Sequence, residues 1–499
     1  MPVARSATLT IAGNAFTIQQ AGADCSTSTN QSTASAPASG ATLTVNVTAT
    51  SNACTWSTTG MPSWITVTSG ATGTGNGVVI LQVQPNTSAL PRGVTILVAG
   101  NGFNITQSAA TGTPTSNLRF VPLAPCRLME TRAEYNYEGR TGAFGPPYVK
   151  AGETRTLTPS NSTVCQVPTT ARAFVLNITL IPRSGVDFVT LFPAGEPRPD
   201  FFSIRSPDGQ IVANQAIVKA GNGALSLYAS HEADVLLDIS GYFADPLPTG
   251  TNLVFYPLTP CRVIETRAAY RTPAGPFGPP SMAKGETRHF RFPSSPHCTI
   301  PAGAAAYSAT LTAVPPLPLP YMTMWASGSV QPNVSSINSF AGRTLANNVI
   351  VPASTNGEID VFAFDRTDFL VDINGYFAAD NGQGLYYNPV TQCRASDADY
   401  GDDTTRTIAI PTAGNCAGIP ATAKGYVINA TAIPAGSPMP FLTLYPTGQP
   451  RPNASVLNAF EGQTVTNTAI IPAGANGSMD VYSFKRTRVV VDVSGYFSR

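Results

Sequence analysis

Apolar and polar residues alternate along most of the chain, and the clearest alternation occurs in a stretch that appears three times. The three copies lie at 237–243, 371–377 and 491–497, and each ends in Gly-Tyr-Phe. Apolar residues occupy every second position before this ending, as in a strand with one face in a core. The opposite face of each copy carries an aspartate: Asp238, Asp372 and Asp492. We expect each aspartate to bond to backbone or to a nearby arginine, because buried carboxylates need partners.

The three copies close three related units, which we expect at 118–243, 253–377 and 385–497. The first two units open on similar motifs, Cys126-Arg-Leu-Met-Glu-Thr-Arg132 and Cys261-Arg-Val-Ile-Glu-Thr-Arg267, whereas the third keeps Cys393-Arg394 and loses Glu-Thr-Arg. Each unit also has an asparagine ahead of an apolar pair: Asn214, Asn347 and Asn467. Repeated units of this size, with alternating runs between turn signals, predict one β-sandwich or jelly-roll-like domain each, the third divergent.

Residues 5–20 predict a β-hairpin, because two alternating runs flank an Ala-Gly-Asn turn. The same pattern recurs without a gap at 92–107, where Ala99, Gly100, Phe103 and Ile105 match Ala12, Gly13, Phe16 and Ile18. The second copy ends a complete unit at 23–108, while almost nothing precedes the first. We therefore expect 1–22 to be the C-terminal hairpin of an incomplete domain, so that the chain begins inside that domain. The polar stretch 109–117 predicts a linker.

The unit at 23–108 contains Cys54-Thr-Trp56, Trp64-Ile-Thr-Val-Thr-Ser-Gly70 and the closing Phe103-Asn-Ile-Thr-Gln107. In these motifs it resembles the BACON domain, an immunoglobulin-like β-sandwich of secreted bacterial proteins that is often attached to glycan-active enzymes. The resemblance implies an immunoglobulin-like sandwich at 23–108, with a partial second copy at 1–22, and carbohydrate or mucin as a ligand. It makes Trp56 and Trp64 candidate glycan contacts, and the alternative is that both belong to the core. Residues 118–497 look similar to tandem β-modules of secreted soil-bacterial proteins with no established activity.

Composition agrees with an all-β chain of tandem sandwiches with negligible helix. Among 499 residues there are 43 Gly and 44 Pro, which break helices and favour short strands joined by turns. The 29 Lys and Arg nearly balance the 28 Asp and Glu, so nucleic acid is not an expected partner. No apolar run approaches the roughly 18–20 residues that span a bilayer. The first residues form no apolar signal segment, and we expect a leader to be missing from this sequence.

The eight cysteines fall into four pairs along the chain, one pair for each complete predicted unit. The pairs are Cys25 with Cys54, Cys126 with Cys165, Cys261 with Cys298, and Cys393 with Cys416. No Cys-x-x-Cys or Cys-His cluster suggests a metal site, so we expect intradomain disulfides. Disulfides indicate an oxidising, extracytoplasmic compartment. Together with the resemblance to the BACON domain, this leads us to expect the surface or exterior of a bacterium.

Residues that could support catalysis are few. His231, His289 and His297 lie in different contexts and do not recur between units, and no nucleotide-binding, nucleophile-elbow or haem-attachment motif is present. We therefore expect neither enzymatic activity nor a cofactor. Glu130 with Arg132, and Glu265 with Arg267, are expected to form structural ion pairs.

One acidic stretch is a candidate for metal binding. Its four aspartates recur at near-alternate positions, which suits calcium, although it lacks the usual loop order and a distal glutamate; they are Asp397, Asp399, Asp402 and Asp403. The alternative is a solvated acidic loop.

These patterns predict a non-catalytic extracellular protein with a structural or adhesive role. A lone hairpin is marginal in water, so residues 5–20 need a partner sheet. A longer chain, a neighbouring domain or a second copy could provide it, and the last would build filaments head to tail. The first alternative function is an array of carbohydrate-binding modules, with Trp56, Trp64 and Tyr137 as candidate contacts. The second is a component of a phage or injection-machine fibre.

Overall fold

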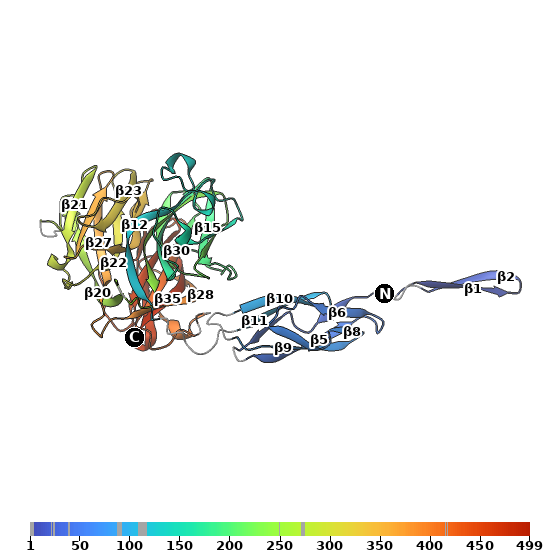
Figure 1. Ribbon diagram of the computed structural model, residues 1–499. Helices are drawn as coiled ribbons and strands as arrows, with labels where there is room; N and C mark the ends of the chain where they lie inside the picture. The colour runs from blue at the N-terminus through green and yellow to red at the C-terminus, as the bar shows by residue number, and fades with distance from the viewer. Residues whose placement is uncertain are drawn as a thin grey trace. The chain divides into compact units, whose positions relative to one another are not determined.

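The computed structural model describes the whole chain except residues 1–3, 21, 23–24, 38–39, 87–91, 108–116, 249, 271–274, 415 and 417. The chain divides into two compact units, Met1–Thr115 and Ser116–Arg499; several of their strands are labelled in Figure 1. Apart from residue 117, the predicted linker 109–117 lies outside the described residues. Regular structure in the described part is β-strand with short 3-10 helices, so the predicted all-β class is confirmed. These helices are η1 (Ala133–Tyr135), η2 (Gly142–Phe144), η3 (Pro159–Asn161), η4 (Ala268–Tyr270), η5 (Phe292–Ser294), η6 (Ile410–Thr412) and η7 (Ala475–Gly477).

The N-terminal unit contains a two-stranded hairpin and a two-sheet sandwich. The hairpin consists of β1 (Arg5–Ile11) and β2 (Asn14–Gln20). One sheet of the sandwich has the order β4 (Thr33–Ala36), β11 (Asn101–Gln107), β10 (Arg92–Val98), β6 (Thr55–Thr59) and β8 (Thr72–Thr74). The other has the order β3 (Thr27–Thr29), β5 (Ala41–Ala49), β9 (Gly77–Val83) and β7 (Ile65–Ser69). Alternating residues from both sheets, such as Val45, Leu81 and Phe103, fill the core between them.

The C-terminal unit contains three repeats with one topology, each a sandwich of two four-stranded sheets. Repeat 1 has β17 (Val212–Lys219), β14 (Ala171–Pro182), β19 (Ala233–Ala244) and β12 (Arg119–Glu130) facing β13 (Thr154–Leu157), β18 (Leu225–Ala229), β15 (Val186–Pro193) and β16 (Ile204–Ser206). Repeat 2 has β25 (Leu345–Pro352), β22 (Ala306–Val314), β27 (Asp368–Ala379) and β20 (Leu253–Glu265) facing β21 (Glu286–Arg291), β26 (Glu358–Ala363), β23 (Leu319–Ala326) and β24 (Ile337–Ser339). Repeat 3 has β33 (Val465–Pro472), β30 (Gly425–Ile433), β35 (Thr487–Ser498) and β28 (Tyr386–Tyr400) facing β29 (Thr404–Ala409), β34 (Ser478–Ser483), β31 (Met439–Pro446) and β32 (Leu457–Ala459).

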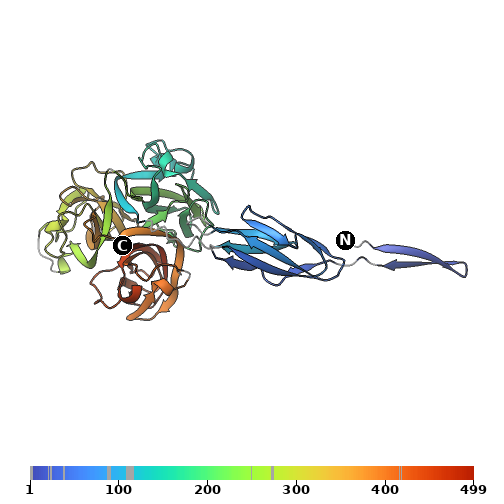
Figure 2. The same cartoon turned by 60° about the horizontal axis from the view of Figure 1, so that its bottom comes forward.

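The three repeats are grouped around a common centre rather than strung in a row (Figure 2). Their first strands pair in a cycle: Phe120 lies opposite Leu253, Phe255 opposite Leu385, and Tyr387 opposite Leu118. The first of these pairings fuses the inner sheets of repeats 1 and 2 into one eight-stranded sheet. The sequence pattern predicted one sandwich per repeat but not this closed arrangement.

Six buried aromatic rings, which we call the aromatic hub, fill the centre. Each repeat supplies one ring from its first strand and one from its closing Gly-Tyr-Phe: Phe120 and Phe243, Phe255 and Phe377, and Tyr387 and Phe497. Each first-strand ring packs on a closing ring of another repeat, with centroid distances of 4.7, 4.7 and 4.3 Å. The closing motif requires glycine, because a Cβ at Gly375 would overlap the ring of Phe255. In the same way, a Cβ at Gly241 would overlap the ring of Phe120, and one at Gly495 the ring of Tyr387.

Candidate functional site

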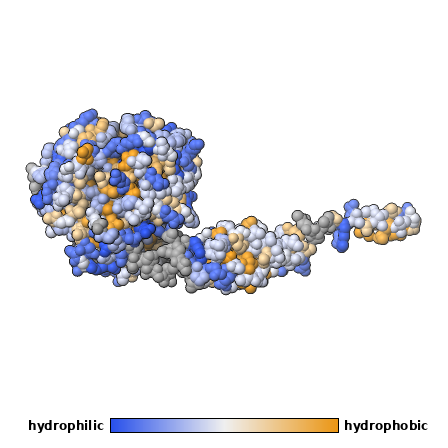
Figure 3. All heavy atoms as spheres, in the orientation of Figure 1, coloured by the Kyte–Doolittle hydropathy of each residue, from blue (hydrophilic) through white to orange (hydrophobic). Residues whose placement is uncertain are grey.

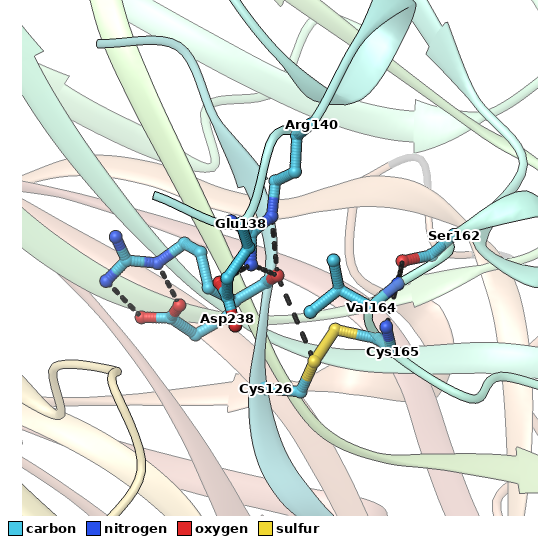
Figure 4. The surroundings of a disulfide bond; sticks show 8 residues. Cys126, Glu138, Arg140, Ser162, Val164, Cys165 and Asp238 are labelled. Carbon is cyan, nitrogen blue, oxygen red and sulfur yellow. Dashed lines mark hydrogen bonds and ion pairs between the residues drawn. A yellow bond between two sulfur atoms is a disulfide. The ribbon is translucent and has the colours of Figure 1, made fainter. Parts of the chain in front are cut away.

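All four predicted cysteine pairs are disulfides, so this prediction is confirmed. Each repeat bridge ties the first strand of its repeat to a later loop. Beside the first of them, buried Arg140 donates from Nε to the carbonyl oxygen of Arg127 at 2.9 Å (Figure 4). Four disulfides fit a protein of an oxidising, extracytoplasmic compartment.

A buried ion-pair cluster follows the disulfide in repeat 1. The Arg127 side chain, 8% exposed, bonds to Asp238 on β19 and donates to Glu130 at 2.7 Å. Arg132 donates two hydrogen bonds of 2.8 Å to the same Glu130 carboxylate. Burial alone would raise the pKa of Glu130, but bonds and charges from Arg132 and Arg127 lower it below its usual value. The backbone N–H of Ser335, from repeat 2, donates to Asp238 at 3.1 Å, so the cluster also joins two repeats.

The other repeats contain versions of this cluster. In repeat 2, Arg262 bonds to Asp372 at 2.8 Å and to Glu265 at 3.0 Å, and Arg267 also grips Glu265. In repeat 3, which lost Glu-Thr-Arg, Arg394 bonds to Asp492 at 2.9 Å and lies 3.7 Å from Asp200 of repeat 1. The predicted structural roles of the three aspartates and of both Glu-Arg pairs are confirmed.

The Asp492 carboxyl should make stability depend on pH. Burial outweighs the bonds from Arg394 and raises the pKa of Asp492 to about 6. A carboxyl whose pKa is higher in the folded state binds protons on folding, so its contribution to stability is lost as pH rises from about 4 to about 6. Relative to Asp492→Asn, we expect the unfolding free energy of the natural protein to fall by about 3 kcal/mol over this interval. Denaturant titrations of both proteins from pH 4 to 7 measure this difference, and parallel curves would contradict it.

A cyclic network of asparagines also links the repeats. Asn214, Asn347 and Asn467 are fully buried. Their Oδ1 atoms accept backbone N–H bonds from Thr468 at 2.9 Å, from Gln215 at 3.0 Å and from Asn348 at 2.9 Å, each in another repeat. Their Nδ2 atoms donate to carbonyl oxygens of their own repeats. Both ends of each amide are thus used, and the network specifies how the repeats fit together.

The candidate calcium site does not form. Asp397 bonds to Arg488 at 2.6 Å, Asp402 to Lys485 at 3.0 Å, and Asp403 accepts from the Tyr482 hydroxyl at 2.6 Å. Across the described residues, no three His, Cys, Asp or Glu side chains, Asp399 included, gather as metal ligands. Asp397, Asp402 and Asp403 each bond to a different partner, so the four aspartates do not converge on one point.

One histidine has acidic neighbours, but their geometry is not that of a catalytic triad. The Nδ1 atom of His289 lies 3.0 Å from Asp360 and 3.0 Å from the Ser327 hydroxyl. A Ser-His-Asp relay needs serine and aspartate on opposite ring nitrogens, whereas here both face the same one. His231 bonds only locally, with its Nδ1 3.0 Å from the hydroxyl of Ser230, and the backbone N–H of His297 donates to Ser295 at 3.3 Å.

The three candidate glycan contacts differ in exposure. Trp56 is 8% exposed and donates from Nε1 to the carbonyl of Gly75 at 2.7 Å, so of the two alternatives for Trp56 the core position is the correct one and it offers no stacking surface. Trp64 packs against the same core, and the Arg92 guanidinium covers its ring at 4.4 Å. Tyr137 is 79% exposed.

The hairpin β1–β2 presents an uncovered apolar face. Its backbone register matches that of β10–β11, and its Arg5–Gln20 bond of 2.8 Å matches the Arg92–Gln107 bond of 2.8 Å. Exposure is where the two differ: Leu9, Ile11, Phe16 and Ile18 are 50–64% exposed, while their counterparts Ile96, Val98, Phe103 and Ile105 are 0% exposed. Figure 3 shows apolar residues on the surface of this hairpin.

Comparisons with known proteins add little to this geometry. No family model matches the sequence, and no curated protein is similar to it at the level searched. Among solved structures, one chain from a study of the triple jelly-roll fold and turret assembly of an archaeal virus aligns over 82% of this chain and 90% of its own, at 9% identity and a TM-score of 0.16. A chain of Sulfolobus Turreted Icosahedral Virus aligns over 76% and 90%, at 9% identity and a TM-score of 0.17. TM-scores this low do not establish a shared fold.

In the part of the chain that the structure describes, no helix is long and apolar enough to cross a membrane.

Proposed function

We propose that this protein is a non-catalytic extracellular structural or adhesive component, and that it forms filaments by head-to-tail assembly. The observation that carries the proposal is the hairpin β1–β2. Its apolar face is exposed, whereas the residues at equivalent positions of β10–β11 lie in the core. Burial of a large apolar side chain stabilises by about 1.5–3 kcal/mol, so four such side chains favour a partner.

The construction of the C-terminal unit supports a mechanical role. Buried charges are paired, the asparagine network is cyclic, and three disulfides tie loops to strands. Such a body resists deformation and unfolding. The adjoining sandwich, with its cystine and core tryptophan, agrees with our proposal that 23–108 is a BACON-like domain.

Strand completion supplies a route to assembly. In the sandwich, β11 pairs with β4 and β10 pairs with β6, and together they cover the opposite sheet. Because β10 and β11 already lie between β4 and β6, a hairpin of the same sequence pattern would add to an edge of a sheet in another copy and cover apolar surface there. Because donor and acceptor are then different surfaces, the contact is heterologous and need not close.

We expect the double substitution Phe16→Asp and Ile18→Asp to abolish self-association of the full chain. Two charges on the apolar face would have to be buried without partners at the contact, which is costly. Sedimentation over a hundredfold concentration range, with electron microscopy at the highest concentration, measures the effect. The natural protein should form concentration-dependent oligomers, and the variant should remain a monomer.

The matched control lies on the other face of the hairpin. Thr8 and Thr17 face each other there at 3.2 Å between hydroxyls, so Thr17→Asp adds charge without touching the apolar face and should leave assembly intact. A natural protein that stays monomeric at every concentration would refute assembly, as would a double variant that associates like the natural protein.

A further inference from the structure

An open cleft lies between repeats 1 and 2, above the buried ion-pair cluster. It has a volume of about 220 Å³ and opens to solvent, so it could hold one small sugar ring with the rest of a ligand outside. Repeat 1 contributes Arg132 and Tyr135, and repeat 2 contributes Tyr321, Asn333 and Phe340. The cleft is therefore a product of how the repeats pack, and no single repeat contains it.

Tyr135 forms a rigid aromatic platform at this cleft. Its ring is 47% exposed, and the guanidinium of Arg132 lies 4.1 Å from the ring centre. Arg132 is itself fixed by its two bonds to buried Glu130. An exposed aromatic ring held in one orientation loses little conformational freedom when a flat ligand stacks on it. The Glu-Thr-Arg motif thus fixes a tyrosine three residues after its arginine.

The charges around the platform cancel. Arg127 and Arg132 face two carboxylates, Glu130 and Asp238, in bonds that use both partners. The cleft therefore has no unpaired charge from this cluster to attract an anion or a cation. Its remaining polar wall is formed by neutral groups, among them exposed Asn333 and buried Asn338, whose Nδ2 donates to the carbonyl oxygen of Pro320 at 2.7 Å. Apolar contacts come from Phe340, which is 43% exposed.

We propose that this cleft binds a neutral saccharide, with one sugar face stacked on Tyr135. A sugar presents apolar C–H groups on its ring faces and neutral hydroxyls at its edge, which matches an aromatic platform beside amides. Repeat 2 builds the same platform, with Arg267 3.8 Å from the ring centre of Tyr270, which is 62% exposed. Repeat 3 has no such pair, because it lacks Glu-Thr-Arg. The proposal does not depend on self-assembly of the hairpin.

The test is a glycan array probed with the labelled full chain, containing neutral, sialylated and sulfated oligosaccharides. Neutral oligosaccharides should bind, and titration calorimetry with the strongest of them gives the Kd. Tyr135→Ala should weaken binding about tenfold or more, because the stacked surface is lost. Tyr135→Phe retains the ring and should bind within about threefold of the natural protein.

Tyr137→Ala is the matched control. Tyr137 is the most exposed tyrosine nearby, with its ring 6.4 Å from that of Tyr135, but it does not line the cleft. Its loss should leave the Kd unchanged. The proposal is overturned by an array without neutral binders, by binding restricted to anionic glycans, or by equal losses in Tyr135→Ala and Tyr137→Ala. Capture of a peptide at Tyr135 in place of any glycan would likewise overturn it. Thermal melts of each variant separate lost binding from lost folding.

Discussion

Replacing Arg127 with methionine is expected to lower the free energy of unfolding of the C-terminal unit by about 3–5 kcal/mol. Methionine keeps much of the side-chain volume but removes the charge that Asp238 and Glu130 share. Glu130 retains Arg132, whereas Asp238 is left with the backbone N–H of Ser335 as its remaining partner among these contacts. A buried carboxylate without a cation is the reason for the large effect. Denaturant titration at pH 7 under oxidising conditions measures it.

Two further variants separate charge from packing. Arg132 is 23% exposed, and Arg132→Met leaves Glu130 bonded to Arg127, so its cost should be clearly smaller. Adding Asp238→Asn and Glu130→Gln to Arg127→Met removes the orphaned charges and should recover part of the loss. If Arg127→Met cost less than about 1 kcal/mol, the cluster would not have the structural role assigned to it.

The alternation of apolar residues predicted the strands, recurring motifs predicted the repeats, and one cysteine pair per predicted unit predicted the disulfide pairing. It succeeded because each repeat has its own core between two sheets, so the face of each strand that turns toward this core is apolar. The aspartates of the closing strands were also assigned correctly. A carboxylate at the same place in three related strands, each with a Cys-Arg motif ahead of it, has an obvious cation to pair with.

The closed arrangement of the repeats could not be predicted in this way, although a signal for it was present. Val175, Ile217 and Phe243 lie on the faces of their strands that turn away from the core of repeat 1, and all three are buried in the central cluster. Strands that are apolar on both faces are buried on both sides. The apolar residues on both faces therefore indicated that something packs on the second face of each inner sheet. The pattern does not show that this partner is the other two repeats.

The candidate site shows the same limit. Tyr135 and Tyr137 are both exposed tyrosines of one loop, and the sequence favoured Tyr137. What distinguishes Tyr135 is the support of Arg132 and its place on a cleft whose other wall lies nearly two hundred residues further along the chain. Trp56 failed as a surface candidate for the opposite reason: its indole fills the space left by Gly73 and Gly77.

Phe243→Ala should be the most damaging substitution in the aromatic hub, at about 3–5 kcal/mol. The ring of Phe243 lies 4.3 Å from that of Tyr387, 5.4 Å from Phe120 and 6.1 Å from Phe377, and so contacts all three repeats. Its removal leaves a cavity that the surrounding rings can only partly fill, because sheets hold them on every side. The repeats should lose stability together, since the lost contacts belong to each of them.

Hydrogen exchange measured by mass spectrometry tests this coupling. In Phe243→Ala, amides of β12, β20 and β28 should lose protection to a similar extent, although only one repeat is mutated. The control is Phe188→Ala, whose partly exposed ring stacks on Phe202 and Tyr228 within repeat 1, and which should affect that repeat alone and cost less. Loss of protection confined to repeat 1 in Phe243→Ala would mean that the repeats are independent sandwiches in contact, and that the hub does not join them into one cooperative body.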